Sequence, residues 1–424
     1  MEHERVRTRA WVLYPDIRNE DTRRDAEAAL GEGVALAAAL PDLEVCGSTV
    51  VRLPRAHPGM LFGSGKIEEL KDLFKGNEVE LVLIDGPVSP VQQRNLEKAW
   101  KVKILDRTGL ILEIFSDRAR TREGVLQVEM AALSYQRTRL VRAWTHLERQ
   151  RGGLGFVGGP GETQIEADRR AIDDQLVRLR RQLDKVIKTR TLHRAARAKV
   201  PYPIVALVGY TNAGKSTLFN RLTGAEVMAK DMLFATLDPT MRRVQIPDGP
   251  EIILSDTVGF ISDLPTELVA AFRATLEEVL SANLILHVRD ISHPETESQS
   301  EDVHTILSSL GVDQERPALE VWNKLDLLSE EEGEARRARA TREEDIHAIS
   351  ALSGEGIDPL LSHIAELLQG ARSQEVLHLD YANGRRRAWL FKEDVVQEEA
   401  QGEQGFEITV LWTAKQKAQF DALG

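Results

Sequence analysis

The sequence predicts an α/β protein whose largest part is a doubly wound domain over residues 200–370. A small α/β domain and a long helical hairpin precede it, and a small α/β domain follows. Two observations lead to this prediction: short apolar runs alternate with amphipathic stretches in two regions, and two long stretches with few helix breakers lie between them. The chain has 424 residues, too many for one compact core, since domains hold about 100–200 residues.

Residues 1–116 are expected to form the first α/β domain. The runs AWVLYP, LEVCGSTVV, ELVLID and KVKILD predict strands, and helices are expected near 65–75 and 89–100. Strands that alternate with helices favour a mainly parallel sheet. Gly63, Ser64, Gly65 and Lys66 precede a helix and could hold a phosphate. They lack the full spacing of a phosphate-binding loop, so a tight turn that opens the helix is the favoured interpretation.

Residues 117–199 are expected to form a basic helical hairpin. Its second helix carries apolar residues at alternating spacings of four and three, which is typical of a coiled-coil seam: Ile172, Leu176, Leu179, Leu183 and Val186. The glycine-rich loop at 152–161 is longer than a plain link needs, and a contact role is expected for it. Residues 118–199 hold 19 Lys and Arg against 9 Asp and Glu, although the whole chain has a net charge of -12. Such segregation favours a polyanionic partner, but solvated helix faces are charged too.

Composition favours a soluble protein of a reducing compartment. Apolar residues make up 42% of the chain, and no uninterrupted apolar run approaches the length of a membrane span. The N-terminus shows no pattern of an export signal, and no membrane anchor is expected. A single cysteine, Cys46, cannot form an internal disulfide. We therefore expect a cytoplasmic protein, and a monomer.

A complete phosphate-binding motif follows the apolar run PIVALV. It has the spacing G-x-x-x-x-G-K-[ST] between a predicted strand and a predicted helix, and it comprises Gly209, Tyr210, Thr211, Asn212, Ala213, Gly214, Lys215 and Ser216, with Thr217 next. Its glycines let backbone N–H groups wrap phosphates at a helix N-terminus. Lys215 is expected to act on the β- and γ-phosphates, and the Ser216 hydroxyl to bind Mg²⁺.

Two further segments complete a nucleotide switch. After the predicted strand EIILSD stand Asp256, Thr257, Val258 and Gly259, where a carboxylate can meet Mg²⁺ through water and the Gly259 N–H can meet the γ-phosphate. Before it lies a segment without regular pattern, FATLDPT, which contains Phe234, Ala235, Thr236, Leu237 and Asp238. Thr236 is expected to be the second hydroxyl ligand of Mg²⁺ and to respond to the γ-phosphate, and Thr240 is the weaker candidate. We call 234–240 the first switch segment and 256–262 the second.

The base is predicted from residues Asn323, Lys324, Leu325 and Asp326. A carboxylate here can accept both N–H donors of guanine, which adenine does not offer, while the lysine stem covers the ring. After a last strand, Ser350, Ala351 and Leu352 form a loop whose Ala351 N–H could bond guanine O6. The sequence therefore predicts a Mg²⁺-dependent GTP hydrolase with GDP as product.

The expected water-positioning residue is missing. Phe260 follows Gly259 where many switch GTPases have glutamine, and a phenyl ring cannot orient water. Intrinsic turnover is therefore expected to be slow, with a catalytic group supplied by another part of the chain or by a partner.

Residues 371–424 are expected to form a small α/β domain. Two runs, RRRAWLFK and FEITVLW, predict strands on either side of an acidic segment.

Five segments together resemble the HflX family of ribosome-associated GTPases, over nearly the whole chain: GYTNAGKST, FATLDPT, DTVGF, NKLD and GGPGETQIEADRR. The resemblance implies a cytoplasmic GTPase that binds the large (50S) ribosomal subunit, is stimulated there, and splits stalled or idle ribosomes or assists subunit maturation, particularly under stress. It also implies that the hairpin approaches 23S rRNA, and that an apolar residue at Phe260 is normal for the group. The alternative is an RNA-binding ribosome assembly factor in which hydrolysis is incidental.

Overall fold

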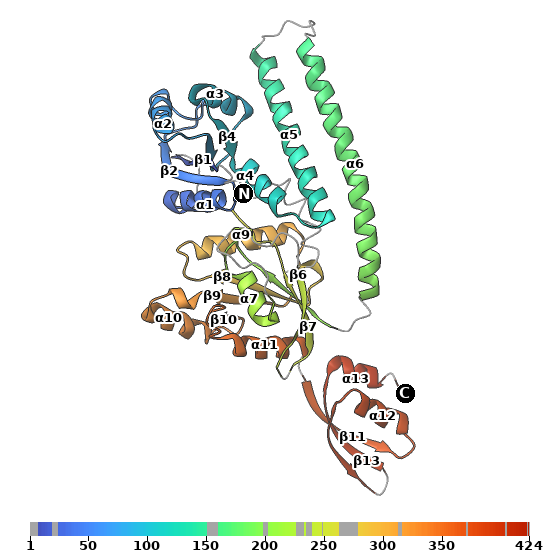
Figure 1. Cartoon of the computed structure of the whole chain (residues 1–424). Helices are drawn as coiled ribbons and strands as arrows, with labels where there is room; N and C mark the ends of the chain where they lie inside the picture. The colour runs from blue at the N-terminus through green and yellow to red at the C-terminus, as the bar shows by residue number, and fades with distance from the viewer. Residues whose placement is uncertain are drawn as a thin grey trace, which may run out of the picture.

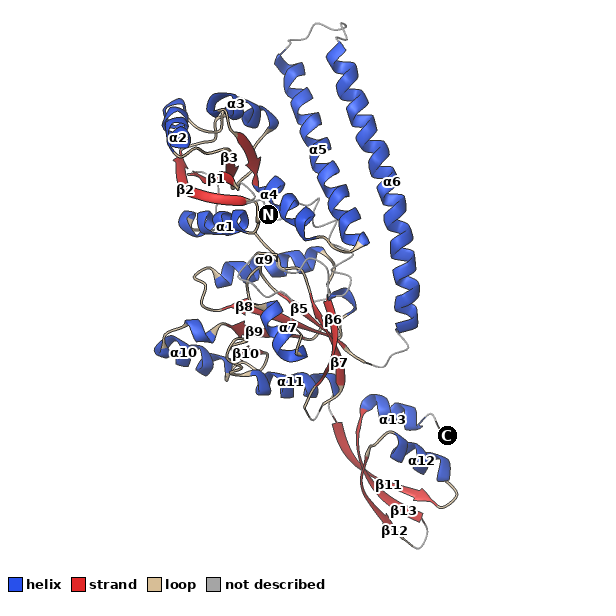
Figure 2. Ribbon diagram, in the orientation of Figure 1, coloured by secondary structure: helices blue, strands red, loops and turns tan. Residues whose placement is uncertain are grey.

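The computed structural model describes residues 7–18, 24–150, 160–197, 202–225, 233–234, 240–247, 249–262, 279–312, 316–369, 372–402, 405–421 and 423. Its helices and strands form three sheet-containing parts and a long pair of helices (Figures 1 and 2). The predicted fold class, a mixed α/β protein built around a doubly wound sheet, is confirmed.

The first domain is a four-stranded parallel sheet with the order β2-β1-β3-β4. Its strands coincide with the four predicted runs: β1 (Thr8–Ile17), β2 (Leu43–Leu53), β3 (Leu81–Ile84) and β4 (Lys103–Asp106). The helices are α1 (Ala26–Ala38), α2 (Ser64–Gly76), α3 (Pro90–Trp100) and α4 (Arg107–Arg118). Because β1 pairs with both β2 and β3, the crossovers diverge there, and such a point commonly opens a crevice at the carboxyl ends of the strands.

Helix α4 did not emerge from the sequence. It begins where Asp106, the last residue of β4, accepts a hydrogen bond of 2.9 Å from the Gly109 N–H. That carboxylate caps the helix. Its apolar residues Leu110, Ile111, Ile114 and Phe115 are buried, at a spacing typical of a helix that packs on one face.

The helical hairpin consists of α5 (Arg122–Gln150) and α6 (Pro160–Arg197). The two helices run antiparallel, since Arg137 pairs with Asp173 at 2.7 Å while Glu129 accepts from Gln175 at 3.2 Å. The five residues of the predicted seam are buried or half-buried, whereas most of their neighbours on α6 are exposed. A seam of this kind joins the helices as the spacing predicted. Residues 151–159, which hold most of the glycine-rich loop, lie outside the described residues.

The central domain is a six-stranded sheet with the order β10-β9-β8-β5-β7-β6. Its strands are β5 (Ile204–Val208), β6 (Thr240–Gln245), β7 (Glu251–Asp256), β8 (Leu284–Asp290), β9 (Ala318–Asn323) and β10 (Ile346–Ala348). Only β6, at one edge, is antiparallel to its neighbour among the described pairs. The helices are α7 (Lys215–Thr223), α9 (Thr296–Ser309), α10 (Glu330–Ala340) and α11 (Ile357–Gln369), with a short 3₁₀ turn at Leu325–Leu327. The phosphate motif and the two base-reading loops all follow carboxyl ends of strands in this sheet.

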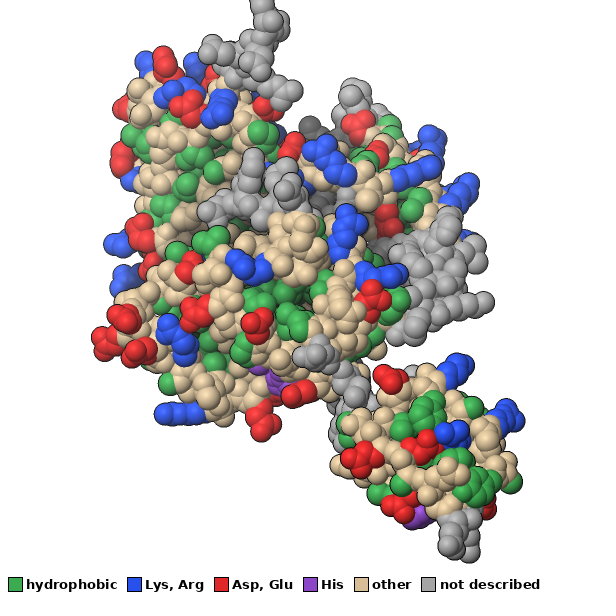
Figure 3. Space-filling model, turned by 60° about the horizontal axis from the view of Figure 1, so that its bottom comes forward, with side chains coloured by type: hydrophobic (Ala, Val, Ile, Leu, Met, Phe, Trp, Pro, Cys, Tyr) green, Lys and Arg blue, Asp and Glu red, His purple; other side chains and the backbone are tan. Residues whose placement is uncertain are grey.

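The last domain is a three-stranded antiparallel sheet, β11-β13-β12, with two helices. Its elements are β11 (Arg372–Asp380), α12 (Gly384–Lys392), β12 (Val396–Gln401), β13 (Gly405–Thr413) and α13 (Ala414–Asp421). The prediction of a strand at FEITVLW is confirmed, and that at RRRAWLFK is wrong. The latter run forms α12, because arginine favours helix and Leu390 is its one fully buried residue. Figure 3 shows this domain as a lobe apart from the larger body, with acidic and basic side chains interspersed on both.

One hydrophobic core crosses from the first domain into the central domain. It includes Ile111, Phe115 and Val128 of the first domain and hairpin, together with Tyr210 and Phe260 of the central domain. The first and central domains are therefore packed on each other through apolar side chains. Within the described residues, every helix is too short or too polar to span a lipid bilayer.

Candidate functional site

The phosphate-binding loop joins β5 to α7 in the setting that the motif predicted. Gly209 has φ +150° and Gly214 has φ +92°, a backbone region that favours glycine. A Cβ at Gly209 would overlap the Val288 carbonyl, and one at Gly214 would overlap the Asn323 amide. Helix α7 then begins at Lys215, so its N–H groups face the loop. The glycines are thus required both for the turn and for close packing.

Lys215 lies buried at the centre of this loop. Its ammonium donates hydrogen bonds to the carbonyls of Gly209, at 3.1 Å, and Tyr210, at 2.8 Å. An ammonium has three donors, so one remains for a phosphate. Burial lowers the pKa of Lys215 to about 8, and the nearby charge of Asp256 partly offsets this effect. An anionic ligand beside the ammonium would favour its charged form and raise this pKa again.

Two predicted magnesium ligands meet next to Lys215. The Ser216 hydroxyl, at the start of α7, donates to Oδ2 of Asp256 at 2.8 Å, and Asp256 is fully buried at the end of β7. A hydroxyl and a carboxylate are oxygen donors of the kind that Mg²⁺ prefers. The donor set therefore fits this cation. The third predicted ligand, Thr236, lies outside the described residues, as do Ala235, Leu237 and Asp238.

The second switch segment is joined to the phosphate-binding loop through the backbone. The Thr211 N–H donates to the Phe260 carbonyl at 2.7 Å, and the Phe260 N–H donates to the Gly209 carbonyl at 3.1 Å. Between them Gly259 packs so closely that a Cβ would lie 3.0 Å from the Lys215 ammonium. The Phe260 side chain is buried in the core shared with the first domain. It points into that core, in keeping with the expectation that it cannot orient water.

Asn323 connects the phosphate and base loops. Its side-chain amide donates to the Ala213 carbonyl at 2.9 Å, and its side-chain oxygen accepts from the Ala351 N–H at 2.9 Å. Asp326 is exposed and accepts from the Ser350 hydroxyl at 2.5 Å. The three predicted loops thus converge on one site. In this arrangement the Ala351 N–H that we expected to bond guanine O6 is engaged by Asn323.

The remaining predicted site residues differ in their contacts and in their exposure. Lys324 has φ +70° and its ammonium pairs with Asp290 at 2.8 Å. The Thr257 hydroxyl donates to the Leu207 carbonyl at 2.6 Å. Phe234 is buried, and its side chain contacts Phe115 of the first domain. The others range from buried to exposed: Val258 and Leu325 are buried, Thr217 is half-buried, and Asn212 and Leu352 are exposed.

Two contributions were missed from the sequence. Arg221 of α7 donates to the Ala351 and Leu352 carbonyls and so ties the base loop to the phosphate helix. The side chains of Tyr210 and Ser262 bind each other, and the Tyr210 hydroxyl also donates to Glu32 of the first domain. An arginine one turn before the end of a helix, as at Arg221, is only a weak signal of a functional contact. No local sequence pattern predicts that Tyr210 and Ser262, or Tyr210 and Glu32, will meet, because they lie far apart along the chain.

Comparison with known proteins covers almost the whole chain. Residues 27–116 match the family described as "GTP-binding GTPase N-terminal", 118–197 "GTP-binding GTPase Middle Region", 204–324 "50S ribosome-binding GTPase" and 335–423 "HflX C-terminal domain". The chain is 50% identical over 392 residues to a GTPase HflX of Magnetococcus marinus, covering 92% of this chain and 90% of the relative. It is 46% identical to the GTPase HflX of Escherichia coli, covering 82% of this chain and 81% of the relative.

A solved GTP-binding protein from Sulfolobus solfataricus in complex with GDP is 22% identical to the chain, with a TM-score of 0.46. The alignment covers 85% of this chain and 98% of that one. The matched families together span the first domain, the hairpin, the central domain and the last domain. With relatives near half identity over most of their length, the chain is a GTP hydrolase that belongs to the HflX family of GTPases.

Proposed function

We propose that this GTPase binds the large (50S) ribosomal subunit and uses its GTP cycle to split stalled or idle ribosomes or to assist subunit maturation, particularly under stress. The observation that carries the proposal is the basic hairpin, which is attached through α4 to the nucleotide site. Exposed arginines line α6, among them Arg169, Arg170, Arg178, Arg180 and Arg181. Such a helix is suited to the phosphates of 23S rRNA.

At the site, Lys215 and the N–H groups of the phosphate-binding loop would hold the β- and γ-phosphates. Ser216, Asp256 through water, and Thr236 would hold Mg²⁺, which neutralises developing phosphate charge. The Gly259 N–H would contact the γ-phosphate, and Asp326 would accept the two guanine donors. Water attacks the γ-phosphorus and GDP leaves with inorganic phosphate as the second product.

Turnover of the free protein is proposed to be slow. Phe260 stands where a polar residue would orient the water, and its ring is buried. A group contributed by the ribosome would then raise the rate. The protein is further proposed to act as a cytoplasmic monomer.

The test is GTP hydrolysis measured with and without purified 50S subunits at several salt concentrations, together with co-sedimentation. We expect stimulation that weakens as salt rises, because phosphate contacts release counterions. Reversing two hairpin charges, Arg178→Glu with Arg181→Glu, should reduce stimulation and leave turnover of the free protein intact. Arg342→Glu with Arg385→Glu, at exposed positions outside the hairpin, is the matched control. Equal loss in both pairs, or no stimulation at all, contradicts the proposal.

The variant Lys215→Ala distinguishes this proposal from the alternative, an RNA-binding assembly factor in which GTP hydrolysis is incidental. If this variant binds 50S subunits and fully rescues cells that lack the protein, the GTP cycle is not the function.

A further inference from the structure

Helix α4 of the first domain contacts both switch segments of the central domain. Its first residue, Arg107, is buried and reaches three acceptors. It donates to the Asp85 carboxylate at 2.6 Å, to the Glu32 carboxylate at 2.5 Å and to the Ser262 backbone carbonyl at 2.8 Å. The first two acceptors belong to the first domain, and the third ends the second switch segment. Arg107 therefore bonds the switch backbone from a position fixed by its own domain.

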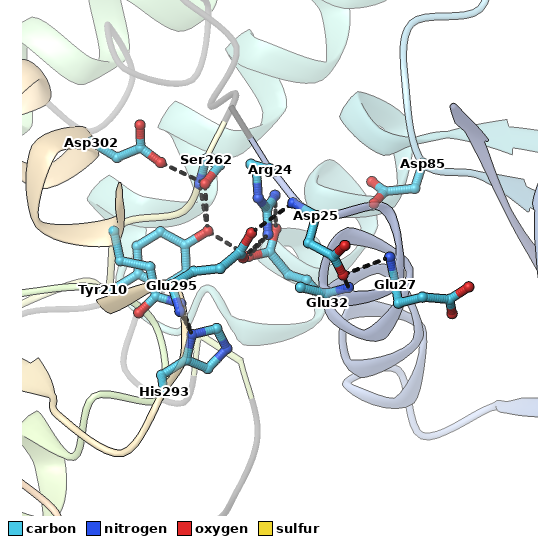
Figure 4. Close-up of polar contacts among 12 residues, drawn as sticks. Arg24, Asp25, Glu27, Glu32, Asp85, Tyr210, Ser262, His293, Glu295 and Asp302 are labelled. Atoms are coloured by element: carbon cyan, nitrogen blue, oxygen red, sulfur yellow. Dashed lines mark hydrogen bonds and ion pairs between the residues drawn. The ribbon is translucent and has the colours of Figure 1, made fainter. Parts of the chain in front are cut away.

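The same place on the second switch segment is bound to the phosphate-binding loop. The Tyr210 hydroxyl accepts from the Ser262 N–H at 2.9 Å and donates to the Glu32 carboxylate of α1. Figure 4 shows Glu32 and Tyr210 directed toward each other, with Ser262 beside the tyrosine hydroxyl. Ser262 is therefore bound through both its carbonyl and its N–H to side chains that themselves bond Glu32.

Of the two carboxylates that Arg107 binds, Glu32 is held in its ionised form, whereas burial raises the pKa of Asp85. Burial opposes ionisation of Glu32, but the charges of Arg107 and Arg24 outweigh it and lower the pKa of Glu32. Arg24 pairs with Glu32 at 3.0 Å and also reaches Glu295 of the central domain at 3.5 Å. A buried charged network loses much of its stabilisation when one partner moves away. The contact between the domains is therefore sensitive to the position of the switch backbone.

The other end of α4 contacts the first switch segment. The rings of Phe115 and Phe234 meet edge to face, with centroids 4.6 Å apart, and both side chains are buried. Phe234 begins the first switch segment and lies two residues before Thr236. Phe115 and Arg107 are eight residues apart, about 12 Å along the helix. One helix thus touches the beginning of one switch segment and the end of the other.

We propose that Arg107 and Phe115 are positioning residues for the two switch segments, so that α4 couples the bound nucleotide to the first domain. The γ-phosphate orders these segments in switch GTPases, and its loss releases them. If their order changes, the fit of α4 changes, and by thermodynamic reciprocity the fit of α4 biases which nucleotide binds more tightly.

The coupling extends to the hairpin. Asp106, which caps α4, accepts from Arg139 at 2.8 Å and from the Tyr135 hydroxyl at 2.5 Å, and both of these residues lie on α5. A displacement of α4 would therefore be transmitted to the middle of α5. This is a path from the nucleotide site to the hairpin.

The test compares affinities for GDP and for a non-hydrolysable GTP analogue in the full chain. The variants are Arg107→Lys, which loses the branched donor group, Tyr210→Phe, which loses only a hydroxyl, and Phe115→Leu. We expect the ratio of the two affinities to change at least about fivefold, in the same direction in all three variants. The double variant, Arg107→Lys with Tyr210→Phe, should change the affinity ratio no more than the single variant with the larger effect. Both substitutions disrupt the same arrangement, the binding of the Ser262 backbone, so their effects should not add.

The matched control is Arg118→Lys at the other end of α4, where the arginine donates to the Ala39 carbonyl within the first domain at 2.9 Å. It should leave the ratio unchanged. A purely structural role for Arg107 would weaken both nucleotides equally and leave the ratio constant, which would overturn the proposal. Opposite shifts among the three variants, or fully additive shifts in the double variant, would overturn it too. The measurement needs no ribosome, so it stands apart from the test of ribosome binding.

Discussion

The Ser350 hydroxyl donates a hydrogen bond of 2.5 Å to the carboxylate of Asp326, the group that we propose reads guanine. Ser350 is fully buried while Asp326 is exposed, so a fixed donor orients an exposed carboxylate. The bond uses one lone pair of the carboxylate and leaves acceptor capacity for two N–H groups of a base.

Ser350→Ala should therefore weaken GTP binding without unfolding the protein. Loss of one hydrogen bond to a charged group corresponds to about 1.5–3 kcal/mol, or roughly 10- to 150-fold in affinity. Titration with a fluorescent GTP analogue measures this change. Ser353→Ala is the control, because that hydroxyl accepts only from the exposed Glu355 N–H among the described contacts. Equal affinities of the Ser350 variant and the unaltered protein would remove the orienting role.

Nucleotide binding should take up a proton at alkaline pH. Burial lowers the pKa of the Lys215 ammonium to about 8, and phosphates beside it favour the charged form and raise that pKa again. At pH 7 the lysine is already charged and uptake should be small, whereas at pH 9 about nine-tenths of a proton should bind with GTP. Affinity should correspondingly fall as pH rises through 8.

Calorimetry in two buffers with different ionisation enthalpies measures this uptake. In the Lys215→Ala variant, the pH-dependent proton uptake on GTP binding should be absent. The same uptake in that variant would assign the proton to another group.

Gly214→Ala should abolish nucleotide binding. The added Cβ would meet the Asn323 amide, and the backbone there has φ +92°. Gly224 at the end of α7 is a matched control, since it has φ +65° but a Cβ added there would meet no atom within 4 Å. Gly224→Ala should lower stability by about 1–2 kcal/mol from backbone strain alone and leave GTP affinity intact. Retained binding in the Gly214 variant would show that the loop can shift away from Asn323.

Gly47→Ala should destabilise the first domain. A Cβ at this position of β2 would overlap the indole of Trp11, which lies across the strand and donates to the Thr49 hydroxyl at 3.1 Å. Overpacking of this kind costs about 1–3 kcal/mol. Thermal unfolding followed by tryptophan fluorescence measures the loss. Combining the change with Trp11→Phe, which shortens the ring, should recover part of it.

The convergence of the three predicted loops could be expected from the sequence because each loop is a short run at the end of a strand. Residues 209–216 form a loop at the end of β5 whose backbone is proposed to bind phosphate, and Asp326 follows β9, which pairs with β8 beside β5. The physical constraint is local in each case. The antiparallel hairpin was predictable for the same reason, since the seam on α6 requires an apolar partner.

The contacts of the first domain with the switch segments could not be predicted this way. Arg107 and Ser262 are 155 residues apart, and Glu32 and Tyr210 are 178 apart. The local sequence around a charged residue does not show whether its side chain will be buried in such a network or exposed. The error at α12 has a different cause: an apolar run flanked by arginines fits both a strand and an amphipathic helix, and tertiary packing of Leu390 decides between them.

The shared use of Asn323 by two loops restricts how this site can change through evolution. A substitution there that relaxed the choice of base would also release the Ala213 carbonyl, so the grip on phosphate would decline together with selectivity. New base preferences should instead arise at Asp326, where a change leaves that bond intact. A change of base preference toward other purines is therefore expected to occur by substitution of Asp326.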